Sequence, residues 1–312
     1  MALPTFSPAA YRRVTLFALV ALVVIVVSGA AVRLSGSGLG CTDWPTCEEG
    51  RLAPESVSDA NAMIEFANRA FTGVVSAAVA LAVLGALRRR PRRGDLTTLA
   101  VGLVIGVAGQ AVLGGMVVWY GLSPWFVMAH FLLSLVLVTD AVVLHHRAGA
   151  PAGPSHPVVG RSTQVVGWLV AASAAVVVVT GTVVTATGPH AGDDSAERFD
   201  LALPDVARVH GGAVIALVAL TLVLLRALWR DGAPAPATDA ARALLLVLVA
   251  QAAVGYTQWF TGVPALLVGV HVLGAVAVWV AVVRAVLALR VVPAAVVAPA
   301  PPVVAPALVT SR

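Results

Sequence analysis

The sequence contains little charge for its length. Of its 312 residues only 11% are charged, 59% are hydrophobic, and the mean hydropathy is +0.94. Because a soluble domain carries about 25% charged residues, this chain lacks the polar groups needed to cover a soluble globule. The composition therefore excludes a soluble enzyme, a disordered chain and a nucleic-acid-binding protein.

Lysine is absent and cysteine is scarce. All 20 basic residues are arginines, and the net charge is +5. The arginines stand in short segments between hydrophobic stretches, so we interpret them as a signal of membrane topology and not of an acidic partner. The two cysteines are too few to form the framework of a disulfide-rich domain.

Long hydrophobic stretches make up most of the remaining sequence. A helix crosses a bilayer with about 20 mostly apolar residues, and eight stretches meet this length. The first is too long for a signal peptide and has no cleavage site of small residues, so we predict that it is a span. We therefore predict an all-α, polytopic membrane protein with spans at residues 14–34, 63–87, 96–118, 125–146, 164–186, 206–228, 243–262 and 264–289.

The arginines predict the orientation of these spans. Fifteen of the 20 lie in the terminal segments and in the loops after the second, fourth and sixth spans, whereas the opposite side holds eleven of the 15 acidic residues. Positively charged loops stay in the cytoplasm. We therefore predict a multi-pass protein of the cell membrane with both termini in the cytoplasm. The Ala-, Pro- and Val-rich residues 291–312 are predicted to be a disordered tail.

Two loops on the predicted outer side are long, residues 35–62 and 187–205. The first contains Cys41 and Cys47. Two nearby cysteines outside the cytoplasm usually pair, and two free thiols are the alternative.

The chain contains an internal repeat. In each copy a glutamine opens a short matching segment, and a histidine follows twenty residues later. Four spans in each copy give both copies the same orientation. We predict two four-helix bundles, residues 1–150 and 151–290, related by a pseudo-two-fold axis along the membrane normal. The matched segments are Gln110–Gly114 with Gln251–Gly255, His130 with His271, and Ser28-Gly29 with Thr180-Gly181.

Three histidines stand near the predicted outer ends of spans. Facing helices of a four-helix bundle commonly hold cofactor ligands, and two neutral imidazoles can ligate one haem iron from both sides. The second copy offers His210 and His271, and the first offers His130 with Asn68 at the position that matches His210. The alternative for each is a core histidine with satisfied hydrogen bonds.

Polar residues near these positions are further candidates. Glu65 lies one helical turn before Asn68, where it is either catalytic or a helix-end acid paired with Arg69. Arg69 and Arg208 stand where haem propionates would reach toward the interface, and ordinary helix-end arginines are an equal alternative.

Two residues have no assigned role at this point. His190, in the second long loop, would cap a site or line an access path, or would be a plain loop residue. Asp140 lies deep in the fourth span, and we identify no partner for it.

The order of these features resembles that of the haem A synthase family, membrane enzymes of bacteria and mitochondria. The resemblance covers roughly residues 14–290. It rests on these segments in order: Gly36-Ser-Gly-Leu-Gly-Cys41 followed by Trp44-Pro45 and Cys47; Ile64-Glu65-Phe66 with Arg69; Gln110 through Gly114; His130-Phe131; and the spans with His210 and His271.

The resemblance implies an oxidoreductase that oxidises the C8 methyl group of haem O to a formyl group, which gives haem A for cytochrome oxidase. It implies haem b between His210 and His271, haem O in the first bundle with Glu65 as the catalytic carboxylate, and a disulfide between Cys41 and Cys47. The sites would lie near the extracytoplasmic face. The implied partners are haem O synthase, cytochrome oxidase assembly factors and an unidentified electron acceptor. A homo-oligomer and the source of the oxygen atom stay open.

The chain departs from the family pattern at Asn68, where the family usually has a fourth histidine. A carboxamide is a much poorer iron ligand than an imidazole. We therefore predict that His130 alone holds the haem of the first bundle and that the opposite side is open, which suits an oxidation. His190 would be a replacement ligand. The alternative functions are a membrane b-type cytochrome that carries electrons without modifying haem, and a transporter.

Overall fold

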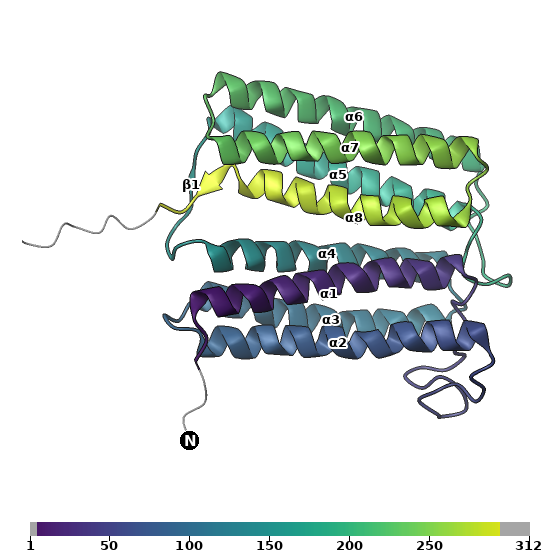
Figure 1. Cartoon of the computed structure of the whole chain (residues 1–312). Helices are drawn as coiled ribbons and strands as arrows, with labels where there is room; N and C mark the ends of the chain where they lie inside the picture. Colours follow the sequence, from purple (N-terminus) through teal and green to yellow (C-terminus); the bar gives the residue numbers. More distant parts are fainter. Residues whose placement is uncertain (1–4, 294–312) are drawn as a thin grey trace, which may run out of the picture.

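Eight helices make up most of the residues that the structure describes. The computed structural model describes residues 5–293. Every helix has the length and hydropathy of a membrane span, so the prediction of an all-α, polytopic membrane protein is confirmed. The helices are α1 (Pro8–Leu34), α2 (Ala60–Arg88), α3 (Gly94–Trp119), α4 (Pro124–Gly149), α5 (Arg161–Thr187), α6 (Leu203–Arg230), α7 (Ala235–Phe260) and α8 (Ala265–Leu287) (Figure 1).

Several helices begin before the hydrophobic stretches, because polar residues cap them. The Ser7 side chain accepts a hydrogen bond from the amide of Ala10, and the proline at the first position of α1 has no amide that needs a partner. The Asp59 carboxylate caps α2 in the same way. At the other extreme, α7 ends at Phe260, earlier than predicted, because Gly262 has a φ of 81° that no helix accommodates.

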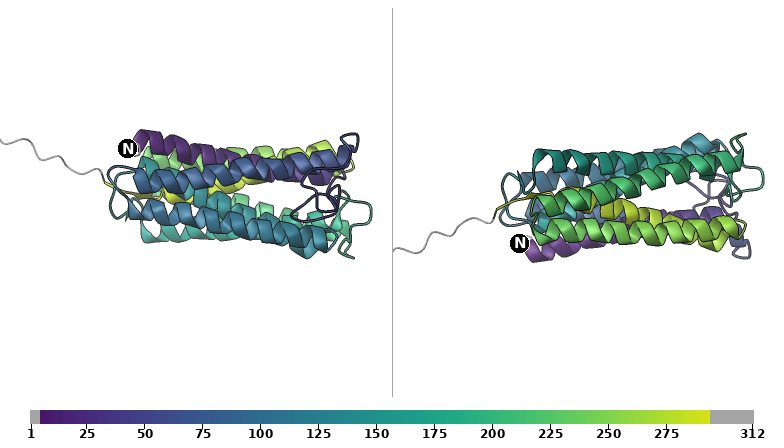
Figure 2. Two further views of the ribbon diagram at one scale, coloured as in Figure 1. Left: turned by 90° about the horizontal axis from the view of Figure 1, so that it is seen from below. Right: turned by 90° about the horizontal axis from the view of Figure 1, so that it is seen from above.

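The helices form two groups that lie side by side with their axes roughly aligned (Figures 1 and 2). Within each group the helices contact one another in a ring, α1 to α4 in the first and α5 to α8 in the second. At the seam between the groups, α1 and α4 contact α8, and α4 also contacts α5.

Aliphatic side chains fill each group and the seam. The seam also contains a polar connection, because the Trp279 indole donates hydrogen bonds to the Thr139 hydroxyl (2.8 Å) and to the Leu135 carbonyl (3.1 Å). Fully buried residues include Leu96, Leu103 and Leu144 in the first group, Leu217, Leu224 and Leu244 in the second, and Val138 and Val276 at the seam.

The two ends of the molecule differ. Loops 35–59 and 188–202 lie at one end, which we call the long-loop end, and loops 89–93, 150–160 and 231–234 lie at the other, which we call the arginine-rich end (Figure 1).

The first residue of the predicted tail, Val291, lies in a short strand. At the arginine-rich end β1 (His156–Pro157) pairs antiparallel with β2 (Arg290–Val291), and the Arg290 guanidinium donates to the Ser155 carbonyl (2.8 Å). These contacts order the chain past residue 291. The rest of the predicted tail, from residue 294, lies outside the described residues.

Candidate functional site

Four side chains occupy one layer near the long-loop end. Each lies within about the first three turns of a helix that begins at this end. They belong to α2, α4, α6 and α8, so each group contributes two. They are Asn68, His130, His210 and His271.

His210 and His271 face each other inside the second group. Their ring centroids are 6.4 Å apart, and the ring planes meet at 71°. If an iron ion binds one nitrogen of each ring at about 2.0 Å, and each ring centre lies about 1.2 Å beyond that nitrogen, the two ring centres are roughly 6.4 Å apart. The spacing of this pair therefore fits bis-imidazole ligation of a haem iron.

The surroundings of His210 set its tautomer. Its Nδ1 lies 3.2 Å from the Thr180 hydroxyl oxygen, and that hydroxyl is already within donating distance of the Val176 carbonyl (2.8 Å). The hydroxyl can therefore accept the Nδ1 proton, which leaves the Nε2 lone pair available for a metal ion. The ring packs closely against Gly181. If residue 181 had a side chain, its Cβ atom would stand only 3.1 Å from Cε1 of His210.

His271 is held through its backbone, and within residues 5–293 its ring has no polar partner. The Gln251 amide donates to the His271 carbonyl (2.8 Å). A Cβ atom on Gly255 would stand 3.1 Å from Cε1 of the ring, and Nδ1 is buried without a partner among the described residues. Either ring nitrogen of a neutral imidazole can bind a metal ion, with the other nitrogen carrying the proton.

The same contacts surround His130 in the first group. The Gln110 amide donates to the His130 carbonyl (3.1 Å), as Gln251 does for His271. A Cβ atom on Gly114 would stand 3.6 Å from Cε1 of His130, and Nδ1 is again buried without a partner in the described part of the chain.

Asn68 makes the contacts that His210 makes in the second group. The Ser28 hydroxyl donates to the Asn68 amide oxygen (2.7 Å), as Thr180 contacts His210. A Cβ atom on Gly29 would stand 4.0 Å from the amide nitrogen of Asn68. The first group therefore pairs an imidazole with a carboxamide where the second pairs two imidazoles.

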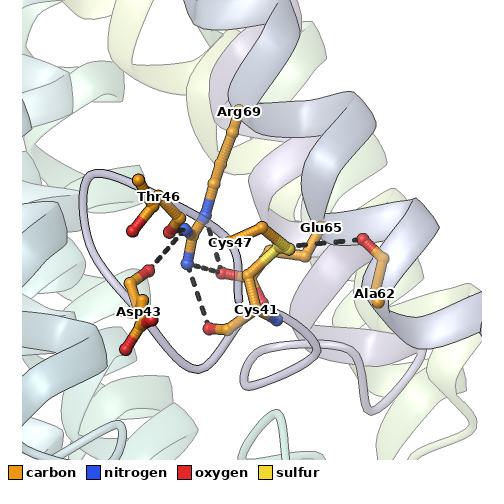
Figure 3. Close-up of polar contacts among 7 residues, drawn as sticks. All are labelled: Cys41, Asp43, Thr46, Cys47, Ala62, Glu65 and Arg69. Atoms are coloured by element: carbon orange, nitrogen blue, oxygen red, sulfur yellow. Dashed lines mark hydrogen bonds and ion pairs between the residues drawn. A yellow bond between two sulfur atoms is a disulfide. The ribbon is translucent and has the colours of Figure 1, made fainter. Parts of the chain in front are cut away.

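Glu65 and Arg69 bind the first long loop (Figure 3). The Glu65 carboxylate is buried and accepts hydrogen bonds from the Cys41 amide (2.8 Å) and from Arg69 (2.5 Å). The Arg69 guanidinium also donates to the carbonyls of Asp43 (2.7 Å), Thr46 (2.8 Å) and Cys41 (3.2 Å). The ion pair with Arg69, which was an alternative to a catalytic role for Glu65, is present, and it attaches the loop to α2.

A disulfide closes this loop. Cys41 and Cys47 are bonded, with Cα atoms 4.4 Å apart, and both residues are buried. The disulfide that the family resemblance implied is confirmed, and the alternative of two free thiols is wrong.

Trp44 extends from the disulfide loop to the first site. A Cβ atom on Gly115 would stand 2.8 Å from its Nε1, and its ring also reaches Gly114, which packs against His130. The Arg69 guanidinium lies 5.2 Å from the centre of the indole, within cation–π range. Sequence reasoning gave Trp44 no role of its own. A signal was present in the repeat, because the second copy has Tyr256 where the first has Gly115.

Comparison with known proteins identifies the family. The model of the COX15-CtaA family, described as cytochrome oxidase assembly protein, matches residues 12–62 and 54–191, which together are more than half of the chain. The chain belongs to this family.

Curated relatives of this family member are named haem A synthase. The protein of Bacillus pumilus is 32% identical over 137 residues, 43% of this chain and 44% of the relative. Those of Lysinibacillus sphaericus and Listeria welshimeri are each 30% identical, over 41% and 40% of this chain and 41% of each relative. The matched regions thus span less than half the length of these relatives.

The sequence singled out three further residues, Arg208, His190 and Asp140, and the structure shows their surroundings. Arg208 is exposed and pairs with Asp205 (2.6 Å). The His190 Nε2 lies 3.0 Å from the Val263 carbonyl, in the loop before α8. Asp140 lies where α4 meets α3, and one of its carboxylate oxygens is buried without a partner among the described residues. The roles of Arg208 and His190 toward haem stay predictions, and no role was predicted for Asp140.

Proposed function

We propose that this protein is a haem A synthase, an oxidoreductase that converts haem O to haem A for cytochrome oxidase. The observation that carries the proposal is the recurrence of one set of contacts around His210 and His271 in one group and around Asn68 and His130 in the other. The names of the curated relatives support it.

We place these sites near the extracytoplasmic face, with both termini in the cytoplasm. Two observations at opposite ends support this orientation. Loops rich in arginine favour the cytoplasm, and a disulfide such as Cys41–Cys47 persists in oxidising compartments. The matched contacts support two bundles, residues 1–150 and 151–290, related by a pseudo-two-fold axis along the membrane normal.

In the second bundle, His210 and His271 would hold haem b through their imidazoles. Thr180 would accept the Nδ1 proton of His210 and so leave Nε2 free to bind iron, and Gln251 fixes the backbone of His271. Bound haem b supplies a one-electron redox centre.

In the first bundle, His130 would hold the iron of haem O, and Asn68 would leave the opposite coordination position open. Oxidation of the C8 methyl group to a formyl group removes four electrons and four protons and adds the oxygen atom of one water equivalent. An alcohol and then a geminal diol are formed, and the diol loses water. An open position suits such a reaction.

Glu65 would accept a proton during this oxidation. Arg69 and the Cys41 amide both donate to its carboxylate and hold it beside the disulfide loop, where a carboxylate could act as a general base. Arg69 would act through Glu65 and the loop. Haem O synthase, cytochrome oxidase assembly factors and an electron acceptor are the proposed partners.

Haem extraction tests the proposal. Membranes that contain the protein and are supplied with haem O are extracted, and the pigments are separated by chromatography. Haem A or its hydroxylated precursor is the expected product. Bound haem b without any new pigment would instead favour the b-type electron carrier, and absence of haem from the purified protein would favour a transporter.

A further inference from the structure

A groove runs along the lipid-facing side of the seam between α1 and α8. Its volume is about 280 Å³. The side chains of Val24 and Leu273 on its rim are 43% and 48% exposed, so the groove opens toward the bilayer. It is lined by Val23, Val24, Val27, Ser28 and Ala31 of α1 and by Leu273 of α8.

The groove adjoins the first site through Ser28. Among the described residues Ser28 is the one polar side chain of the lining, and its hydroxyl donates to the Asn68 amide oxygen (2.7 Å). Ser28 therefore borders the groove on one side and the first site on the other. Leu273 follows His271 by two residues, so the groove lies at the depth of the proposed haem sites.

Packing closes the groove on two sides. Toward the long-loop end, Leu34 packs against Gly269, where a Cβ atom would stand 3.3 Å from Cδ1 of the leucine. Behind the groove, Val26 and Val276 belong to the buried cluster at the seam. A molecule in the groove would reach it from the bilayer or from the first site.

We propose that this groove binds the farnesyl tail of haem O while the porphyrin occupies the first site; this proposal rests on the proposed function. Five of the six lining residues carry hydrocarbon side chains, which bind a prenyl chain without hydrogen bonds. Small-molecule pockets measure about 300–1,000 Å³, so this volume suits part of a chain and not a porphyrin. The proposal explains how two neighbouring sites receive different haems, because haem b has no such tail.

Competition between the two haems tests the proposal. Full-length protein with its second site loaded is titrated with haem O or with haem b, and binding to the first site is followed by absorption. The variant Val27→Trp fills the groove. Val179→Trp is the matched control, because Val179 precedes Thr180 as Val27 precedes Ser28 and its side chain is 44% exposed. Ala31→Leu is a milder filling variant, should Val27→Trp fail to fold.

We expect the groove variants to weaken binding of haem O about tenfold and to change binding of haem b less than twofold, with no effect of Val179→Trp. Unchanged affinity for haem O in the groove variants overturns the proposal, because the groove would then be occupied by bilayer lipid. An equal loss of affinity for haem O and haem b overturns it as well. Binding is read separately from turnover. A wild-type protein that prefers haem O but never forms haem A would refute the proposed function and leave the groove assignment standing.

Discussion

The substitution Glu65→Ala is expected to destabilise the protein and to stop product formation. The side chains of Glu65 and Arg69 are only 8% and 15% exposed. Removing one partner of a buried ion pair costs about 3–5 kcal/mol, because the other charge loses its compensation. Arg69 keeps three carbonyl acceptors in the disulfide loop, so we expect a loss near the lower limit, about 3 kcal/mol.

Two measurements on the purified variant separate these effects. A loss of this size lowers the Tm by roughly 5–10 °C, which thermal unfolding measures. General base catalysis contributes about 10²–10⁴-fold to a rate, so the haem A yield should fall at least about a hundredfold. Haem b should stay bound at His210 and His271. Glu65→Gln keeps a hydrogen-bond acceptor for the Cys41 amide and should recover part of the stability without recovering the reaction.

Glu55→Ala is the matched control. Glu55 also pairs with an arginine at a spacing of four residues, Arg51 (2.9 Å), but both side chains are exposed, and exposed pairs contribute little. We expect no change in the Tm or in the haem A yield. An unchanged yield in Glu65→Ala would remove Glu65 from the mechanism. An equal fall of the Tm in both variants would refute burial as the cause.

Three further substitutions test the proposed ligands. His271→Ala should abolish the haem b absorption of the purified protein, and a normal spectrum would contradict the ligand assignment. Thr180→Val, which exchanges a hydroxyl for a methyl group, should speed the transfer of haem b to apomyoglobin about 10–100-fold, because hydrogen bonds to a ligand tune its affinity; an unchanged rate would argue against Thr180 as the orienting residue. Asn68→His should convert the first-site haem to a low-spin form that no longer binds cyanide. The first-site haem of the wild-type protein should bind cyanide. Spectra of the wild-type protein that show two equivalent bis-histidine haems would refute the open coordination position at the first site.

The spans could be predicted from the sequence because the bilayer imposes one length and one composition on every helix that crosses it. The helix ends were predicted less well. They depend on capping by single residues such as Ser7 and Asp59, which a hydropathy average does not detect.

The repeat predicted which residues correspond, and the structure adds what they do. Ser28 and Thr180 served only as markers of the repeat in the sequence, yet both hydroxyls contact the side chain at the matched position of the next helix, Asn68 or His210. For Trp44 the one signal was the exchange of Tyr256 for Gly115 between the copies. Trp44 itself comes from an aperiodic loop and reaches α3 at Gly115, far along the chain, and no local pattern specifies such a contact.

The indole of Trp279 shows how far the two copies have diverged. Trp279 follows His271 by eight residues, and the residue eight positions after His130 is Val138, which has no donor. The hydrogen bond from Trp279 of the second copy to Thr139 of the first therefore has no counterpart donated by the first copy. Two copies of the first half, or two of the second, could not reproduce this junction with its partners. The junction is therefore made by one copy of each half, and each half can differ from the other at its own site without losing it.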